Sequence, residues 1–393
     1  MIKQTTHLAW KNLTAAPSRF ALACGAISFA VVLMFLQAGF RNALLDSPVK
    51  LVEALGGDLI ALSPARYTLA AEMRFRARLL NRMESDSDVV SVTPIFIERW
   101  ITVLRIPGQP AKTIRVIGLP IETGNVTNPQ LDQKLPLLAQ PLSALIDRHS
   151  KRSFGIPIAD FEAMKATEVE LMDKRLRLVG RVTIGADFAH DGNLIVSQRN
   201  FGEFFTFRNG GDPLGVVDLA LIRLQPGADA AKIAEVQGRL NQLAPRELSI
   251  MTRQELIDRE QSFWANATPI GVIFTAGLLV GFSVGVIICY QILFTEIHDH
   301  IGEFATLKAM GYGNRYFLKV VLQQALYLAT CGFLPGLAIS WLAFRGLEWL
   351  SGLPLAMTVL RVLIIFALTI GMCLAGGLLA MRKLINADPA KLF

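Results

Sequence analysis

Four long stretches without a charged residue are spaced unevenly along the chain, and they constrain its fold more than any other feature. They run from Phe20 to Phe40, from Gln261 to Thr295, from Val320 to Phe344 and from Val362 to Met381. Each is long enough to cross a bilayer core as a helix, which takes about 20 predominantly apolar residues. The sequence therefore predicts four transmembrane helices, with a large insertion between the first helix and the last three.

The insertion between the first two stretches has the composition of a soluble domain. The whole chain is 52% hydrophobic and 18% charged, which is too apolar for a soluble protein and too polar for membrane helices alone. Runs of β-branched residues alternate with helical patterns inside the insertion. We expect a membrane α-helical protein that carries a large extracytoplasmic α+β domain made of two subdomains.

Periodicity predicts individual elements of the insertion. A strand is expected at 58–62, a helix at about 69–83 that carries several arginines, and two strands broken near Pro94 within 89–104. Alternation of apolar and polar residues predicts a half-buried strand at 216–224. Further strands are expected at 113–119, 169–184, 193–198 and 247–251, and helices at 228–243 and from Arg253 onward into the membrane.

Both ends of the chain are basic next to the membrane, and most of the net charge of +7 lies outside the nearly neutral insertion. Cytoplasmic flanks of membrane helices carry an excess of Lys and Arg. We therefore expect both termini in the cytoplasm, which agrees with four crossings, and the insertion on the outer side. The basic residues are Lys3, Lys11 and Arg19 before the first helix, and Arg382, Lys383 and Lys391 after the fourth.

Together these patterns predict an order of segments along the chain. Transmembrane helices are expected at 20–40, 266–295, 316–344 and 356–381, and cytoplasmic segments at 1–19, 296–315 and 382–393. The outer domain is expected at 41–265, with a core subdomain at about 45–119 and 213–265, an inserted subdomain at about 120–212, and a short outer loop at 345–355.

Motifs that carry chemistry are missing from the sequence. It contains no phosphate-binding loop, no Gly-x-Ser-x-Gly elbow and no His-Glu-x-x-His metal helix. His298 and His300 are two residues apart, which places them on different faces of a helix. The sequence has no basic stripe interleaved with aromatic residues, so nothing in it indicates nucleic-acid binding. We expect no enzyme activity, and no catalytic, cofactor-binding or metal-binding residue.

The four cysteines, Cys24, Cys289, Cys331 and Cys373, lie one in each membrane stretch. The outer domain is therefore expected to fold without disulfides.

Glycines at Gly277, Gly281 and Gly285 recur every four residues in the second membrane stretch. This spacing places them on one helix face, where another helix can approach closely. Two interpretations remain open: packing against the first helix of the same chain, or a dimer seam.

A short helical pattern occupies the segment between the second and third membrane stretches. Apolar residues recur at Ile297, Ile301, Phe304 and Ala305, and Gly311 follows as a helix stop. A short amphipathic helix is marginal in water unless its apolar face is covered. The membrane surface or a partner protein can cover this face.

Several local motifs resemble one family of membrane proteins, the FtsX/MacB superfamily of permeases, which are membrane subunits of type VII ABC transporters. The DevC-type branch is the most similar, and the likeness runs from end to end. The motifs are LAWKNL at 8–13, EFATLKAMGY at 303–312, DPA at 388–390, DLI at 58–60, YQIL at 290–293, the segments 29–46 and 186–194, and the ending ADPAKLF.

The resemblance implies a mechanism in which the chain itself hydrolyses no ATP. Such permeases sit in the bacterial inner membrane as homodimers with a periplasmic domain, and a separate cytoplasmic ATPase binds ATP and Mg. Segment 1–19 is then an amphipathic helix and 296–315 the coupling segment. The expected ATPase-coupling residues are Ile301, Glu303, Phe304, Thr306, Leu307, Met310 and Gly311, with Glu303, Thr306, Leu307 and Met310 as the principal contacts.

The same resemblance implies further partners and a cargo. A periplasmic adaptor (a membrane fusion protein) and a TolC-like outer-membrane channel would receive an amphiphile such as a glycolipid, and membrane lipids surround the helices. Two alternatives stay open: an FtsX-like regulator of cell-wall hydrolases, and a membrane sensor. A sensor needs a cytoplasmic output module, for which the short cytoplasmic segments leave little room.

Overall fold

The structure is a computed structural model that describes residues 9–122, 124, 126–150, 154, 167–185, 190–351 and 355–385. The expected features at 1–8 and 386–393, including the motif at 388–390, lie outside the described residues, as do parts of 120–212 and of 186–194. The chain divides into two compact units, which we describe separately. The helical unit comprises Met1–Asn42, Ile270–Gly346 and Leu355–Phe393, and the sheet unit comprises Ala43–Pro269 and Leu347–Pro354.

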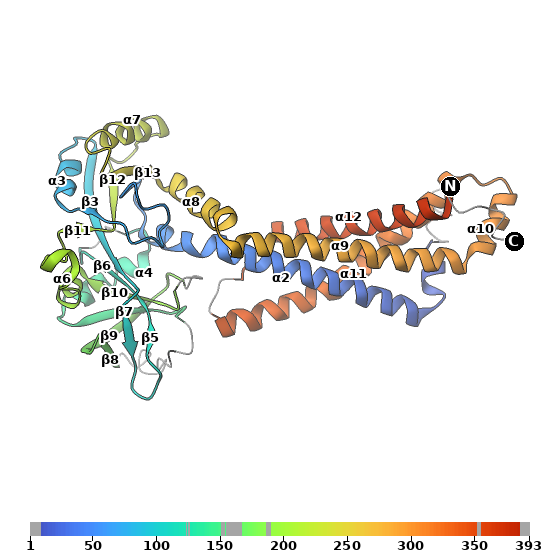
Figure 1. Ribbon diagram of the computed structural model, residues 1–393, viewed down its shortest axis with the longest axis horizontal. Helices are drawn as coiled ribbons and strands as arrows, with labels where there is room; N and C mark the ends of the chain where they lie inside the picture. The colour runs from blue at the N-terminus through green and yellow to red at the C-terminus, as the bar shows by residue number, and fades with distance from the viewer. Residues whose placement is uncertain are drawn as a thin grey trace. The chain divides into compact units, whose positions relative to one another are not determined.

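Long helices make up most of the helical unit. Four of the described helices are long and apolar enough to cross a membrane, which confirms the four predicted spans. Figure 1 shows them running alongside one another. Residues 9–14 form one further helical segment within the expected N-terminal helix. The helices are α2 (Pro17–Leu55), α9 (Pro269–Asp299), the short α10 (Ile301–Ala309), α11 (Asn314–Ser351) and α12 (Val359–Ile385).

The sheet unit contains strands and short helices, so the predicted α+β domain is confirmed. Its strands are β1 (Leu59–Leu62), β2 (Phe75–Arg76), β3 (Val89–Glu98), β4 (Val103–Arg105), β5 (Lys112–Thr113), β6 (Arg115–Leu119), β7 (Ser143–Asp147), β8 (Thr167–Leu171), β9 (Lys174–Val182), β10 (Asn193–Ser197), β11 (Val216–Val217), β12 (Leu219–Leu224) and β13 (Ser249–Thr252). Its helices are α3 (Arg78–Glu84), α4 (Pro129–Asp132), η1 (Leu135–Ala139), α6 (Gln198–Phe204), η3 (Arg208–Gly211), α7 (Ala230–Asn241), α8 (Arg253–Ser262) and the π-helical turn η4 (Phe263–Ala267).

One continuous sheet joins most of the described strands, in the order β13-β1-β12-β3-β6-β10-β7-β9-β8-β4-β5. Most neighbours are antiparallel, but β10 pairs with β6 and β7 pairs with β9 in parallel. Strands from both expected subdomains take part, because β6 of the expected core pairs with β10 of the expected insertion. The boundary between the two subdomains therefore stays a prediction.

Apolar side chains fill both faces of this sheet. Successive residues of β3 alternate between two cores: Phe96 belongs to one core, whereas Ile95 and Ile97 belong to the other. The first core includes Phe201 of α6, and the second includes Leu256 of α8. The unit is thus held by apolar packing on both sides of the sheet.

The predicted break near Pro94 is wrong, because β3 runs without interruption from Val89 to Glu98. Pro94 lies opposite Ala220 of β12. The pairing of β3 with β6 begins only at Phe96. Proline lacks the amide hydrogen that a second neighbouring strand would need, so an open edge tolerates it.

The predicted helix at 69–83 is wrong in its first half. Only α3, from Arg78 to Glu84, is helical, and the residues before it form the short strand β2, which pairs with β11. Leu69 donates its backbone N–H to Glu260 at 2.6 Å instead of forming a helical hydrogen bond. Tertiary contacts therefore override the local helical pattern here.

The strand at 216–224 is present, but it is buried on both faces instead of one. It divides at Asp218 into β11 and β12, and β12 lies between β1 and β3 in the sheet. The strands predicted at 58–62, 113–119, 193–198 and 247–251 and the helix at 228–243 are confirmed to within a few residues. The segment 169–184 is a hairpin of β8 and β9, whose two turn residues Met172 and Asp173 both have positive φ.

Candidate coupling helix, helix seams and charge cluster

The short helix α10 ends in a Schellman motif built around Gly311. Gly311 has φ of +97°, and its N–H donates to the carbonyl of Lys308 at 3.0 Å. The N–H of Tyr312 reaches back to the carbonyl of Leu307 at 3.2 Å. These two bonds satisfy carbonyls that the helix end leaves free, and the left-handed conformation favours glycine. The predicted helix stop at Gly311 is therefore confirmed.

One face of α10 gathers the residues expected to contact the ATPase. Glu303, Thr306, Leu307 and Met310 are separated by intervals of three, one and three residues, which places them within about 100° of arc on a helix. Glu303 and Thr306 are exposed, Leu307 is half-buried, and Met310 is 64% exposed. An exposed methionine beside a leucine is an adaptable apolar contact surface.

Charges at the two ends of α10 agree with its helix dipole. Glu303 lies in the first turn and Lys308 in the last. Glu303 also approaches Nδ1 of His300 at 3.2 Å, and the Thr306 hydroxyl donates to the carbonyl of Gly302 at 2.9 Å. The backbone of Phe304 and Ala305 is helical, but their side chains lie outside the described residues.

The predicted apolar stripe of this helix is wrong at its beginning. Ile297 belongs to α9, which continues to Asp299, and it is buried there. His300, with φ of −101° and ψ of 16°, interrupts the helix before Ile301 starts α10. Ile297 and Ile301 are therefore not on one helix.

The three glycines of α9 face α2 of the same chain. A Cβ added at Gly277 would lie 2.5 Å from the Gln37 side chain, and one at Gly281 would lie 3.3 Å from Met34 Cγ. A Cβ at Gly285 would lie 3.3 Å from Ala30, and closer still to the side chain of Met372 on α12. Of the two interpretations left open, the structure supports packing within the chain, since this face is already covered.

Helix α11 packs on another side of α2 through two glycines that the sequence reasoning missed. Cβ atoms added at Gly332 and Gly336 would lie 2.6 Å from Ile27 and 2.8 Å from Val31. The hydroxyl of Ser28, between them, donates to the carbonyl of Gly332 at 2.7 Å. The four-residue spacing of Gly332 and Gly336 was the available signal.

Among the described glycines of the helical unit, Gly376 of α12 lies closest to the backbone of a neighbouring helix, and the sequence reasoning missed it too. A Cβ added there would lie 2.8 Å from the backbone nitrogen of Tyr290, and 2.9 Å from both Cys289 Cβ and the Val286 carbonyl of α9. Cys289 in turn directs its thiol toward the Cys373 carbonyl at 3.5 Å. All four cysteines are free thiols.

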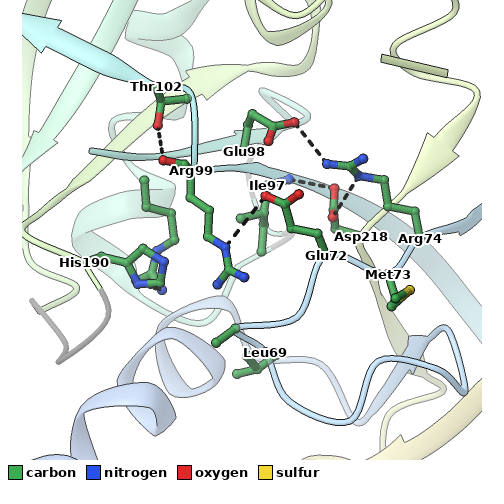
Figure 2. A network of polar contacts seen from close by, with 12 residues as sticks. Leu69, Glu72, Met73, Arg74, Ile97, Glu98, Arg99, Thr102, His190 and Asp218 are labelled. Atoms are coloured by element: carbon green, nitrogen blue, oxygen red, sulfur yellow. Dashed lines mark hydrogen bonds and ion pairs between the residues drawn. The ribbon is translucent and has the colours of Figure 1, made fainter. Parts of the chain in front are cut away.

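A buried charge cluster centred on Asp218 organises the sheet unit (Figure 2). Arg208 donates to the Asp218 carboxylate at 2.7 Å and Arg66 at 3.2 Å, while Arg74 approaches it at 3.4 Å. Arg74 also pairs with Glu98 at 3.0 Å. The side chains of Arg66, Arg208 and Asp218 are at most 2% exposed, so these charges depend on one another for stabilisation.

A second buried carboxylate, Glu260 of α8, holds the segment that follows Arg66. It accepts the Thr68 hydroxyl at 2.9 Å and the Leu69 N–H at 2.6 Å. Burial raises the pKa of Glu260 and of Glu98 above the usual value of a glutamate. Burial likewise lowers the pKa of Arg66, against the attraction of Asp218.

These clusters bind together the loop 63–74, the end of β3 and α8. Within the part of the chain that the structure describes, no group of three or more His, Cys, Asp or Glu side chains could hold a metal ion. Buried arginines and carboxylates that neutralise one another hold these segments in place.

The architecture is therefore that of a helical protein with four spanning-length helices and a large α+β unit. Residues 270–389, from α9 to α12, match the family model described as FtsX-like permease C-terminal. The C-terminal helices α9–α12 are therefore similar to this part of FtsX-like permeases. No curated protein matches the chain.

Several solved structures are similar to part of the chain, including the following two. The periplasmic region of MacB from Actinobacillus actinomycetemcomitans is 14% identical, and the match covers 53% of this chain and 94% of that structure at a TM-score of 0.35. The extracellular domain of the noncanonic ABC-type transporter YknZ from Gram-positive bacteria is 11% identical, with coverages of 50% and 99% and a TM-score of 0.32. Both likenesses are distant.

Proposed function

We propose that this chain is the permease subunit of an ABC-type export complex in a bacterial inner membrane. A separate cytoplasmic ATPase binds ATP and Mg, and the chain itself is not an enzyme. The chain passes the motion of that ATPase through its helices to the sheet unit in the periplasm. The motion drives export of an amphiphile such as a glycolipid.

The observation that carries this proposal is the exposed face of α10 within the segment that matches FtsX-like permeases. Met310 is exposed on this face beside Leu307, Thr306 and Glu303. A nine-residue helix is too short to be stable on contacts of its own. A groove on the ATPase that accepts this face would stabilise α10 and couple it to ATP-driven closure.

The remaining partners follow from the same proposal. Two copies of the chain form a homodimer that is served by two ATPase copies. An adaptor protein and a TolC-like outer-membrane channel accept the cargo. Since α2 of the same chain covers Gly277, Gly281 and Gly285, the homodimer contact is proposed to lie elsewhere on the helical unit.

Leu307→Asp is expected to release the ATPase and abolish ATP-dependent export. A carboxylate at the centre of an apolar contact must be desolvated without a counter-charge, which costs several kcal/mol. The measurement is copurification of the tagged permease with its ATPase, together with export, for the wild type and the variant.

Ala309→Asp is the matched control, since it adds the same charge to an exposed position of α10 outside the proposed face. This variant should retain the ATPase. If Leu307→Asp copurifies and exports as the wild type does, or if both variants lose the ATPase equally, the contact is not on this face.

The proposed orientation makes a separate prediction. With the four native cysteines replaced, a cysteine introduced at Asp173 should react with a membrane-impermeant maleimide in intact spheroplasts, because Asp173 is exposed in the β8–β9 turn. A cysteine at Lys308 should react only after the membrane is opened. The reverse labelling pattern would show that the orientation is opposite and that α10 cannot contact a cytoplasmic ATPase.

A further inference from the structure

A pocket of about 340 Å³ in the sheet unit combines cationic side chains with tryptophans. It is lined by Arg99, Arg115, His190, Trp100, Trp264 and Thr113, together with two aliphatic residues. Among the described residues that line it, none is acidic. The volume lies within the range of small-ligand sites. None of these residues takes part in the coupling helix or in the glycine seams.

The cationic side of the pocket is built from fixed groups. Arg115 is buried, donates to Asn193 Oδ1 at 2.7 Å and lies 3.2 Å from His190 Nδ1. Arg99 follows β3, and Figure 2 shows it reaching toward Glu72 on one side, with His190 on the other. Glu72 lies 3.8 Å from Arg99 Nε. Guanidinium groups held in this way are suited to a phosphate, sulfate or carboxylate.

The apolar side of the pocket consists of two tryptophans from distant segments. Trp100 is a large apolar side chain, yet it is 71% exposed. The guanidinium of Arg99 lies 5.0 Å from the centre of the Trp100 ring. Trp264 comes from the π-helical turn η4 and packs edge-on against Phe263. Two aromatic surfaces next to cations fit a molecule with an apolar body and an anionic group.

From this geometry we infer that the pocket binds the anionic head and adjoining apolar part of an amphiphile. The anion is held by Arg99, Arg115 and His190, and the apolar part packs against Trp100 and Trp264. The molecule is either a phospholipid of the surrounding bilayer or a separate amphiphilic ligand, since both carry this chemistry. The inference goes beyond the proposed ATPase coupling and holds whether or not α10 contacts an ATPase.

The test uses the full chain in phosphatidylcholine nanodiscs with Trp10, Trp341 and Trp349 replaced by Phe. Since the chain has five tryptophans, Trp100 and Trp264 then supply the tryptophan fluorescence. Octyl phosphate, below its micelle concentration, is expected to change this emission saturably. Octyl glucoside, which has the same chain length and no charge, is expected to bind at least tenfold more weakly.

Two variants identify the pocket. Arg99→Gln is expected to weaken octyl phosphate binding about tenfold, because it removes a charged hydrogen-bond partner. Trp100→Ala, at an exposed position where the fold does not depend on the side chain, should weaken it as well, with Trp264 as the reporter. Arg105→Gln, on β4 outside the pocket and half exposed, is the matched control and should bind as the wild type does.

Nanodiscs that contain phosphatidylglycerol separate the two sources of the ligand. Weaker apparent binding of octyl phosphate in them supports a bilayer phospholipid as the occupant, whereas unchanged binding supports a separate amphiphile. Equal affinity for octyl phosphate and octyl glucoside would overturn the inference. So would unchanged binding by Arg99→Gln and Trp100→Ala. No step of the test involves an ATPase, so a failure here leaves the proposed coupling untouched.

Discussion

Asp218→Asn is expected to destabilise the sheet unit by about 3–5 kcal/mol, the usual cost of removing one partner from a buried ion pair. The substitution keeps the size of the side chain and removes its charge. Arg74 and Arg208 would then keep Glu98 as their carboxylate partner, whereas Arg66 would lose its ion pair. Since domains are stable by only about 5–15 kcal/mol, this loss is a large fraction of the total.

The loss can be measured on the full chain by pulse proteolysis in a urea series, with cleavage followed within Ala43–Pro269. The midpoint should fall by roughly 1–3 M urea. Asp173→Asn is the control, because Asp173 pairs with Arg105 on the surface and is 79% exposed, where an ion pair contributes little. A midpoint for Asp218→Asn no lower than that of Asp173→Asn would show that the cluster is not needed for stability.

The sequence did not predict this cluster, because its residues lie far apart along the chain. Arg66 and Asp218 are separated by 152 residues, and no local pattern connects them. The arginines at 74–82 were instead assigned to one helix, because their spacing is also compatible with a helical surface. The pairing of β2 with β11 brings Arg74, just before β2, to Asp218, just after β11, and such long-range pairing cannot be read from periodicity.

The four spanning helices were predictable because a bilayer imposes a simple condition on length and charge. The helix α10 was predictable only in part. Gly311 marks its end, since a Schellman motif favours glycine. Its start was missed, because neither proline nor glycine signals the interruption at His300, and the apolar spacing continues across it from Ile297.

Glycine spacing identified one helix seam, but it missed the glycine that lies closest to the backbone of a neighbouring helix. Gly277, Gly281 and Gly285 repeat every four residues and therefore attract attention in the sequence. Gly376 has no such repeat, since Gly371 and Gly377 lie five residues before and one residue after it. Its importance arises from one close approach to the backbone of α9, and no glycine repeat in α12 indicates that approach.

Gly376→Ala is therefore expected to destabilise the helical unit more than a Gly→Ala substitution at any other described glycine of this unit. The new Cβ would lie 2.8–2.9 Å from Tyr290 N, Cys289 Cβ and the Val286 carbonyl. Two of these are backbone atoms that cannot rotate away, so α9 and α12 must separate and lose their packing, which holds helices together in lipid. Overpacking of this kind costs about 1–3 kcal/mol, which corresponds to a fall of roughly 5 °C in Tm.

Gly371→Ala on the same helix isolates the effect of the close approach. A Cβ at Gly371 would meet Phe282 at 3.9 Å, an ordinary contact, so its Tm in detergent should equal or slightly exceed that of the wild type because alanine favours the helix. Gly281→Ala should fall between the two, since its nearest neighbour, the flexible Met34 side chain, lies at 3.3 Å. Equal Tm values for Gly376→Ala and Gly371→Ala would contradict a tight α9–α12 seam, because both substitutions change helix propensity alike and differ only in what the added methyl group meets.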